Sequence, residues 1–114
     1  MDDALPVLVI EAELVLAPGT DPRAPGGAVT TALCGHWEHE GPCRWPHHNA
    51  MAAEGATARL RTVVVPGEDA DEVRRRFRVA LDADPGWGLL HCGDSPLAPG
   101  EEALARRLAE GPRA

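Results

Sequence analysis

Cysteine and histidine, which bind transition metals readily, are concentrated in one short segment of this chain. Four of the five histidines and two of the three cysteines lie within residues 34–48. Zinc is held tetrahedrally by thiolate and imidazole groups, and ligands a few residues apart can surround an ion at a low entropic cost of loop closure. The spacing Cys-x-His-x6-Cys-x3-His therefore predicts a zinc site with the ligands Cys34, His36, Cys43 and His47, and with His48 or His39 as alternates.

The segment of residues 34–49 has no periodic pattern that could order it as a helix or a strand. Two glycines, Gly35 and Gly41, and two prolines, Pro42 and Pro46, interrupt it. Glycine lets the chain fold back on itself, and proline reduces the number of conformations open to the unbound loop. These residue types fit a metal-binding loop insertion.

Two other interpretations of the same segment stay open. A disulfide between Cys34 and Cys43 is one of them, and it requires an oxidising compartment. The odd number of cysteines and the acidic start Met1-Asp2-Asp3, unlike the basic start of a secretory signal, favour the cytoplasm and hence a metal. The other interpretation is a surface turn in which the histidines are exposed. In that case the thiols of Cys34 and Cys43 are buried as small apolar groups.

Three functions would suit such a site. In the first, zinc closed by four protein ligands orders the loop, which presents Trp37 and Trp45 to a protein or small molecule. For the tryptophans themselves, shielding of the ion and enlargement of the core is favoured over direct contact with a ligand. In the second, the ion keeps an open position and Glu38 or Glu40 acts as general base on a bound water, as in a small hydrolytic metalloenzyme. In the third, the surplus histidines carry or sense another transition metal. Four well-spaced ligands favour the first function.

A second pair of metal-binding side chains, His91 and Cys92, lies outside this cluster. The pair falls on a predicted strand, so the two side chains point to opposite faces and only one of them can face any given site. We expect Cys92 in the core and His91 exposed. The alternative is that one of them completes the metal shell.

Composition excludes several other classes of protein. A net charge of −7 and a pI near 5.1 disfavour nucleic acid, whose phosphates are usually neutralised by basic side chains. No apolar stretch approaches the roughly 20 residues that a membrane helix needs. The chain has no Gly-rich phosphate loop and no Gly-x-Ser-x-Gly motif, and its single serine, Ser95, precedes a proline in a predicted turn. All 11 basic residues are arginine, which indicates GC-rich, bacterial coding.

The remaining sequence predicts the elements that must position the site. Apolar alternation predicts strands, and apolar spacing of three and four residues predicts helices. A single α+β domain over residues 1–114 follows, with two layers: a mixed sheet of about four strands in the order βββαβα and two helices on one of its faces. The strands are expected at 7–16, 28–33, 57–66 and 87–92, and the helices at 69–83 and 100–110, with a loop over 17–27.

The same pattern predicts specific contacts. If strands 7–16 and 57–66 are neighbours, Arg59 and Arg61 face Glu11 and Glu13 across them. Phe77 and Leu104 should be buried beneath the two helices, and Trp87 should lie in the core. The arginines of residues 74–78 pair with acidic residues one helical turn away, which is typical of a solvated helix face.

Overall fold

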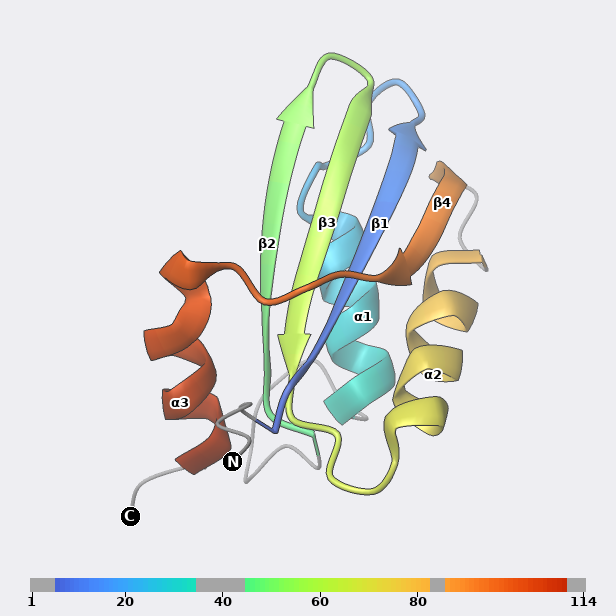
Figure 1. Cartoon of the computed structure of the whole chain (residues 1–114). Helices are drawn as coiled ribbons and strands as arrows, with labels where there is room; N and C mark the ends of the chain where they lie inside the picture. Colours follow the sequence, from blue (N-terminus) through green and yellow to red (C-terminus); the bar gives the residue numbers. More distant parts are fainter. Residues whose placement is uncertain (1–5, 35–44, 83–85, 111–114) are drawn as a thin grey trace.

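The computed structural model describes residues 6–34, 45–82 and 86–110, and these form a small α+β fold (Figure 1). Within these ranges, four strands and three α-helices follow one another in the order β-α-β-β-α-β-α. None of the described helices is long and apolar enough to cross a membrane. The elements are β1 Leu8–Leu16, α1 Ala24–Cys34, β2 His47–Glu54, β3 Thr57–Val64, α2 Ala70–Asp82, β4 Trp87–Asp94 and α3 Glu102–Glu110, with a 3-10 turn, η1 Pro99–Glu101, before α3.

The four strands form one antiparallel sheet in the order β2-β3-β1-β4. Helix α1 connects β1 to β2, and α2 connects β3 to β4, so each helical connection passes over one intervening strand. Two interleaved units of this kind make the split βαβ, or ferredoxin-like, topology. The mixed sheet predicted from the sequence is wrong, because the strand between each parallel pair runs antiparallel to both.

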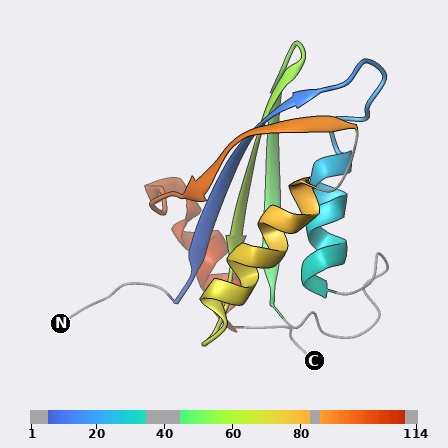
Figure 2. The same ribbon diagram turned by 90° about the vertical axis from the view of Figure 1, so that its right-hand side faces the viewer.

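Helices α1 and α2 lie side by side on one face of the sheet, which we call the inner face (Figure 2). The even-numbered apolar residues of β1 point to this face, as their alternation predicts. Trp45 and Phe77 are the largest fully buried side chains among the described residues. The prediction of a buried Phe77 is confirmed, and Trp87 is also in the core, at 7% exposed.

Helix α3 packs on the opposite, outer face of the sheet (Figure 2). It buries Ala105 against Val9 and Val63, and the flanking Leu104 and Leu108 are partly buried there. The prediction that both expected helices cover one face is therefore wrong. The odd-numbered residues of β1 and β3 include an apolar pair, Val9 and Val63, that requires a cover of its own.

The region predicted as a loop at 17–27 and a strand at 28–33 instead contains α1. Its sequence includes Pro25, two glycines and the β-branched run Val29-Thr30-Thr31, all of which disfavour a helix interior. Burial outweighs this propensity, because residues 25, 29 and 33 fall on one helix face and are all buried.

Strand β2 also differs from the prediction, because it begins within the segment predicted to be irregular. Its sequence, HHNAMAAE, has no β-branched residue and so gives little strand signal. It is an edge strand that pairs only with β3 among the described strands. His47, Asn49 and Met51 face inward, opposite Val64, Thr62 and Leu60.

The cross-strand ion pairs predicted from the sequence are confirmed. Glu11 lies opposite Arg61 with 3.0 Å between the charged atoms, and Glu13 lies opposite Arg59 with 3.5 Å. Arg61 also donates two hydrogen bonds to Glu101, of 2.6 and 2.8 Å, from a side chain that is 20% exposed. This bidentate pair fastens η1 and the start of α3 to the outer face.

Replacing Glu101 with glutamine should loosen α3. Hydrogen bonds from Arg61 hold the pKa of Glu101 below its ordinary value of 4.5, so the carboxylate stabilises the fold above that pH, and the stabilisation disappears as the pH falls through the folded-state pKa. We expect Glu101→Gln to lower the free energy of unfolding at pH 7 by about 1–2 kcal/mol. The difference from wild type should vanish in acid.

The matched control is Glu102→Gln, which changes the neighbouring, exposed carboxylate. Urea denaturation at several pH values and hydrogen exchange of the α3 amides would measure both variants. Equal effects of the two substitutions would show that the Arg61–Glu101 pair does not hold α3.

Candidate functional site

Two of the predicted metal ligands meet where α1 ends and β2 begins. Cys34 is the last residue of α1 and His47 is the first residue of β2. The Cys34 Sγ atom lies 4.0 Å from Nδ1 of His47, and both groups are partly buried. Two other predicted ligands, His36 and Cys43, lie outside the described residues, as do the alternate ligand His39, Trp37, Glu38 and Glu40.

The structure brings His47, and not its alternate His48, to Cys34. Successive side chains of β2 point to opposite faces of the sheet. His47 faces inward, toward α1, whereas His48 is exposed on the outer face. A site that includes Cys34 therefore uses His47.

Trp45, two residues before His47, holds this part of the chain against the core. Its side chain is 2% exposed and belongs to the inner core, so it adds bulk there instead of facing solvent. The indole N–H donates to Oδ2 of Asp69 at 3.2 Å, and the guanidinium carbon of Arg76 lies 4.9 Å from the ring centroid. These contacts on α2 and the turn before it fix where β2 starts.

A chain of hydrogen bonds orients the His47 ring from inside the fold. Nε2 lies 3.1 Å from the Thr30 hydroxyl, and Nδ1 lies 3.1 Å from the carbonyl oxygen of Trp45. The Asn49 amide donates to the same Thr30 hydroxyl at 3.0 Å, and the buried Thr62 hydroxyl donates to the Asn49 carbonyl at 2.7 Å. Such a hydroxyl at Nε2 is the kind of partner that orients a histidine ligand.

The redox state of Cys34 decides whether its sulfur can bind a metal. Cys34 is disulfide-bonded in the structure, and Cys92 is a free thiol. Only a thiolate is a good metal ligand, so Cys34 could bind zinc only after reduction. Within the described ranges, no group of three or more His, Cys, Asp or Glu side chains could hold a metal. Of the four predicted ligands, Cys34 and His47 lie within the described residues.

His91 and Cys92 lie far from this junction. They are on β4, the opposite edge of the sheet from β2. Three interstrand spacings separate the two edges, or about 14 Å, which is too far for a shared ion. Cys92 packs against the inner core, where burial raises the pKa of its thiol, and His91 is exposed opposite Glu13 on the outer face.

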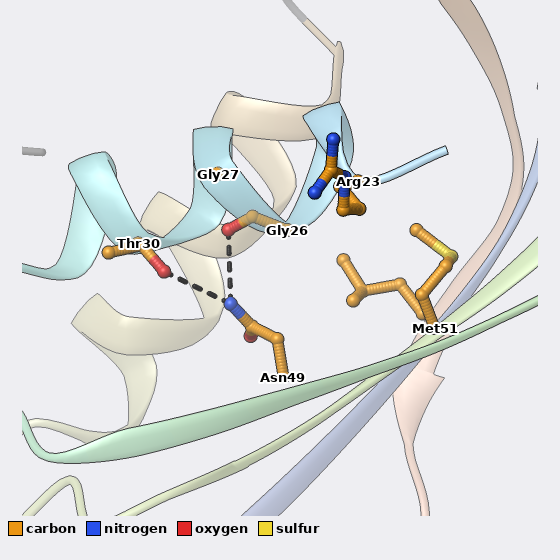
Figure 3. A pocket seen from close by; sticks show the side chains of 7 residues that line it. Arg23, Gly26, Gly27, Thr30, Asn49 and Met51 are labelled. Atoms are coloured by element: carbon orange, nitrogen blue, oxygen red, sulfur yellow. Dashed lines mark hydrogen bonds between the residues drawn. The ribbon is translucent and has the colours of Figure 1, made fainter. Parts of the chain in front are cut away.

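A cavity of about 430 Å³ lies at the other end of α1, between its first turns and the inner side of β2 and β3 (Figure 3). Asn49 reaches from β2 to α1 beside it and donates to the Gly26 carbonyl oxygen and to Thr30. This cavity could not be expected from the sequence, because a Pro-Gly-Gly segment is typical of a loop. The lining residues are Arg23, Gly26, Gly27, Thr30, Asn49, Met51 and Leu60.

Comparisons with protein-family models, with curated proteins and with solved structures found no match to the chain. In the described part of the chain, the Cys34–His47 junction and the cavity beside α1 are the features on which the proposals below are based. The two features share Thr30, which contacts His47 and also lines the cavity.

Proposed function

We propose that this chain is a small metal-binding protein in which one divalent ion, zinc, orders the segment between α1 and β2. The ordered segment then serves to bind a protein or a small molecule. The observation that supports the proposal is the 4.0 Å approach of Cys34 Sγ to His47 Nδ1, two predicted ligands from different elements.

The distance between these atoms is close to what a shared zinc ion needs. Zn–S and Zn–N bonds of about 2.3 and 2.0–2.1 Å at a tetrahedral angle place the two donor atoms about 3.6 Å apart. The observed separation of 4.0 Å requires a shift of only a few tenths of an ångström. His36 and Cys43 would be the other two ligands.

One nitrogen of the His47 ring has a partner that would support metal binding through the other. Nδ1 lies 3.1 Å from the carbonyl oxygen of Trp45, which can only accept a hydrogen bond, so Nδ1 must lose its proton and this bond to bind the ion. Nε2 then carries the ring proton and donates it to the Thr30 hydroxyl, which lies 3.1 Å away. Asn49 holds that hydroxyl in place from the other side. A fixed second partner of this kind selects the tautomer of a histidine ligand and restricts its ring.

The proposal applies to the reduced protein. A disulfide at Cys34 removes the thiolate that zinc requires. A reducing compartment keeps the thiolate available, whereas an oxidant would release the ion and leave a disulfide in its place. The oxidised protein therefore serves as a metal-free control for the reduced, zinc-bound protein.

Elemental analysis tests this function directly. Protein purified under reducing conditions, without chelator or added metal, should contain close to one zinc ion per chain, and the same protein after thiol oxidation should contain almost none. Because the ligands must lose their protons, affinity should fall as the pH drops through the histidine and cysteine range. Metal content well below one equivalent in the reduced protein, with thiols that titrate at once, would contradict the proposal.

A further inference from the structure

The cavity beside α1 is open because two of its wall residues on the helix have no side chain. Gly26 and Gly27 lie one turn after Arg23 on the face that looks toward β2. A Cβ atom built on Gly26 would come no closer than 3.6 Å to Asn49, which is an ordinary van der Waals contact. An alanine would therefore fit and would suit a helix better. Glycine at this position is not required by packing, and it leaves the space empty.

The width of the cavity is fixed by a polar strut. The Asn49 amide donates to the Gly26 carbonyl oxygen and to the Thr30 hydroxyl, each at 3.0 Å, and its carbonyl accepts a hydrogen bond from Thr62. The strut holds α1 at a set distance from β2. In the described part of the chain, no buried side-chain nitrogen or oxygen lacks a hydrogen-bond partner. Met51 and the buried Leu60 give the cavity an apolar wall, and this part of the space suits an apolar body.

One charge stands at the mouth of the cavity. Among the described residues that line it, only Arg23 is charged, and its side chain is 89% exposed. Its pair with Asp21 uses Nε and Nη2, at 3.3 and 3.1 Å. A guanidinium has five N–H donors, so donors remain for the oxygen atoms of a ligand. The described lining residues include no acidic side chain, and the carboxylate of a ligand would share the Arg23 guanidinium with Asp21.

We propose that this cavity binds a small aliphatic or aromatic monocarboxylate. The apolar body lies against Met51 and the buried Leu60, and the carboxylate lies at the mouth, beside Arg23. A volume of about 430 Å³ is within the range of cavities that enclose small organic ligands. Neither Cys34 nor His47 lines the cavity, although Thr30, which contacts His47, does. The two sites therefore share one wall residue, and each has its own test.

Titration of the full chain with octanoate, and separately with octanol, tests the proposal by amide chemical shifts in NMR spectra. Octanoate should give saturable shifts confined to residues 23–30, 49–51 and 60. Arg23→Gln should weaken octanoate binding by about tenfold, the loss of one charge-assisted contact, and leave octanol binding unchanged. Arg59→Gln, which removes an exposed, acid-paired arginine from the outer face, is the matched control and should change neither.

Two further variants fill the cavity from opposite walls. Gly26→Ala should raise thermal stability, because alanine favours a helix, yet weaken octanoate binding. Met51→Trp should abolish binding from the strand side and covers the case in which one filling variant fails to fold. Absence of saturable binding, shifts spread over other surfaces, equal effects of Arg23→Gln and Arg59→Gln, or binding undiminished in both filled variants would each overturn the proposal.

Discussion

Replacing Phe77 with alanine should destabilise the fold by about 3–5 kcal/mol, the usual loss when a fully buried phenylalanine is truncated. Phe77 is 0% exposed and lies in the inner core, between α2 and the sheet. The substitution removes an aromatic ring from a core that has few of them, since the chain contains one Phe, three Trp and no Tyr. A loss of this size is a large part of the stability of an ordinary domain.

Urea denaturation followed by circular dichroism measures this effect. The matched control is Val79→Ala, because Val79 is on the same helix but 53% exposed. Its effect should stay within about 0.5 kcal/mol. A loss below about 1 kcal/mol for Phe77→Ala would show that the inner face of α2 is assigned wrongly.

Removing either of the proposed ligands Cys34 and His47 should reduce the zinc affinity of the reduced protein by more than about 100-fold. Loss of an outer partner of a metal ligand typically lowers affinity 10- to 100-fold, and loss of a direct ligand should exceed that. Cys34→Ser and His47→Gln are the variants. Because binding energy in such sites becomes folding energy, zinc should also raise the melting temperature of the wild type and fail to raise that of either variant.

The sheet itself offers controls for both substitutions. Cys92→Ser and His91→Gln change the same residue types on β4, at the far edge from β2. Zinc competition titrations under reducing conditions should give wild-type affinity for both controls. Thr30→Val should give an intermediate loss, because it removes the hydroxyl next to His47 Nε2. Equal affinities for Cys34→Ser and Cys92→Ser would exclude Cys34 as a ligand.

The elements with strong periodic patterns could be predicted from the sequence. β1 carries five apolar residues at alternate positions, and α2 carries Val73, Phe77 and Leu81 at intervals of four. These patterns reflect burial on one face, which is also what holds the elements in place. The cross-strand pairing of Glu11 with Arg61 followed from the same alternation, because charges on the outer face mark the register.

The elements that were missed have weak local signals. Helix α1 forms despite Pro25 and two glycines, because burial of Val29 and Leu33 outweighs the intrinsic propensity. Strand β2 forms because its partner β3 supplies the ladder. Antiparallel pairing of all four strands depends on which strand each helical connection crosses, and a single sequence does not specify this.

The metal site stays a prediction from composition, and the arrangement of its residues could not be read from the sequence. Clustering of cysteine and histidine indicated a metal, but the choice between His47 and His48 depends on the phase of β2 relative to α1. The cavity beside α1 depends on the hydrogen bond from Asn49 on β2 to Gly26 on α1, which lie 23 residues apart. No local sequence pattern predicts such a contact.

Cobalt substitution tests whether the ion has a closed site with sulfur and nitrogen ligands. Reduced, metal-free protein titrated with Co²⁺ without oxygen should saturate at one equivalent. The intense visible bands of a tetrahedral ion should then appear together with near-ultraviolet thiolate-to-cobalt charge transfer, and one equivalent of zinc should remove both. Weak bands typical of higher coordination, an exchangeable water on the cobalt, or a spectrum without the thiolate band would contradict the account.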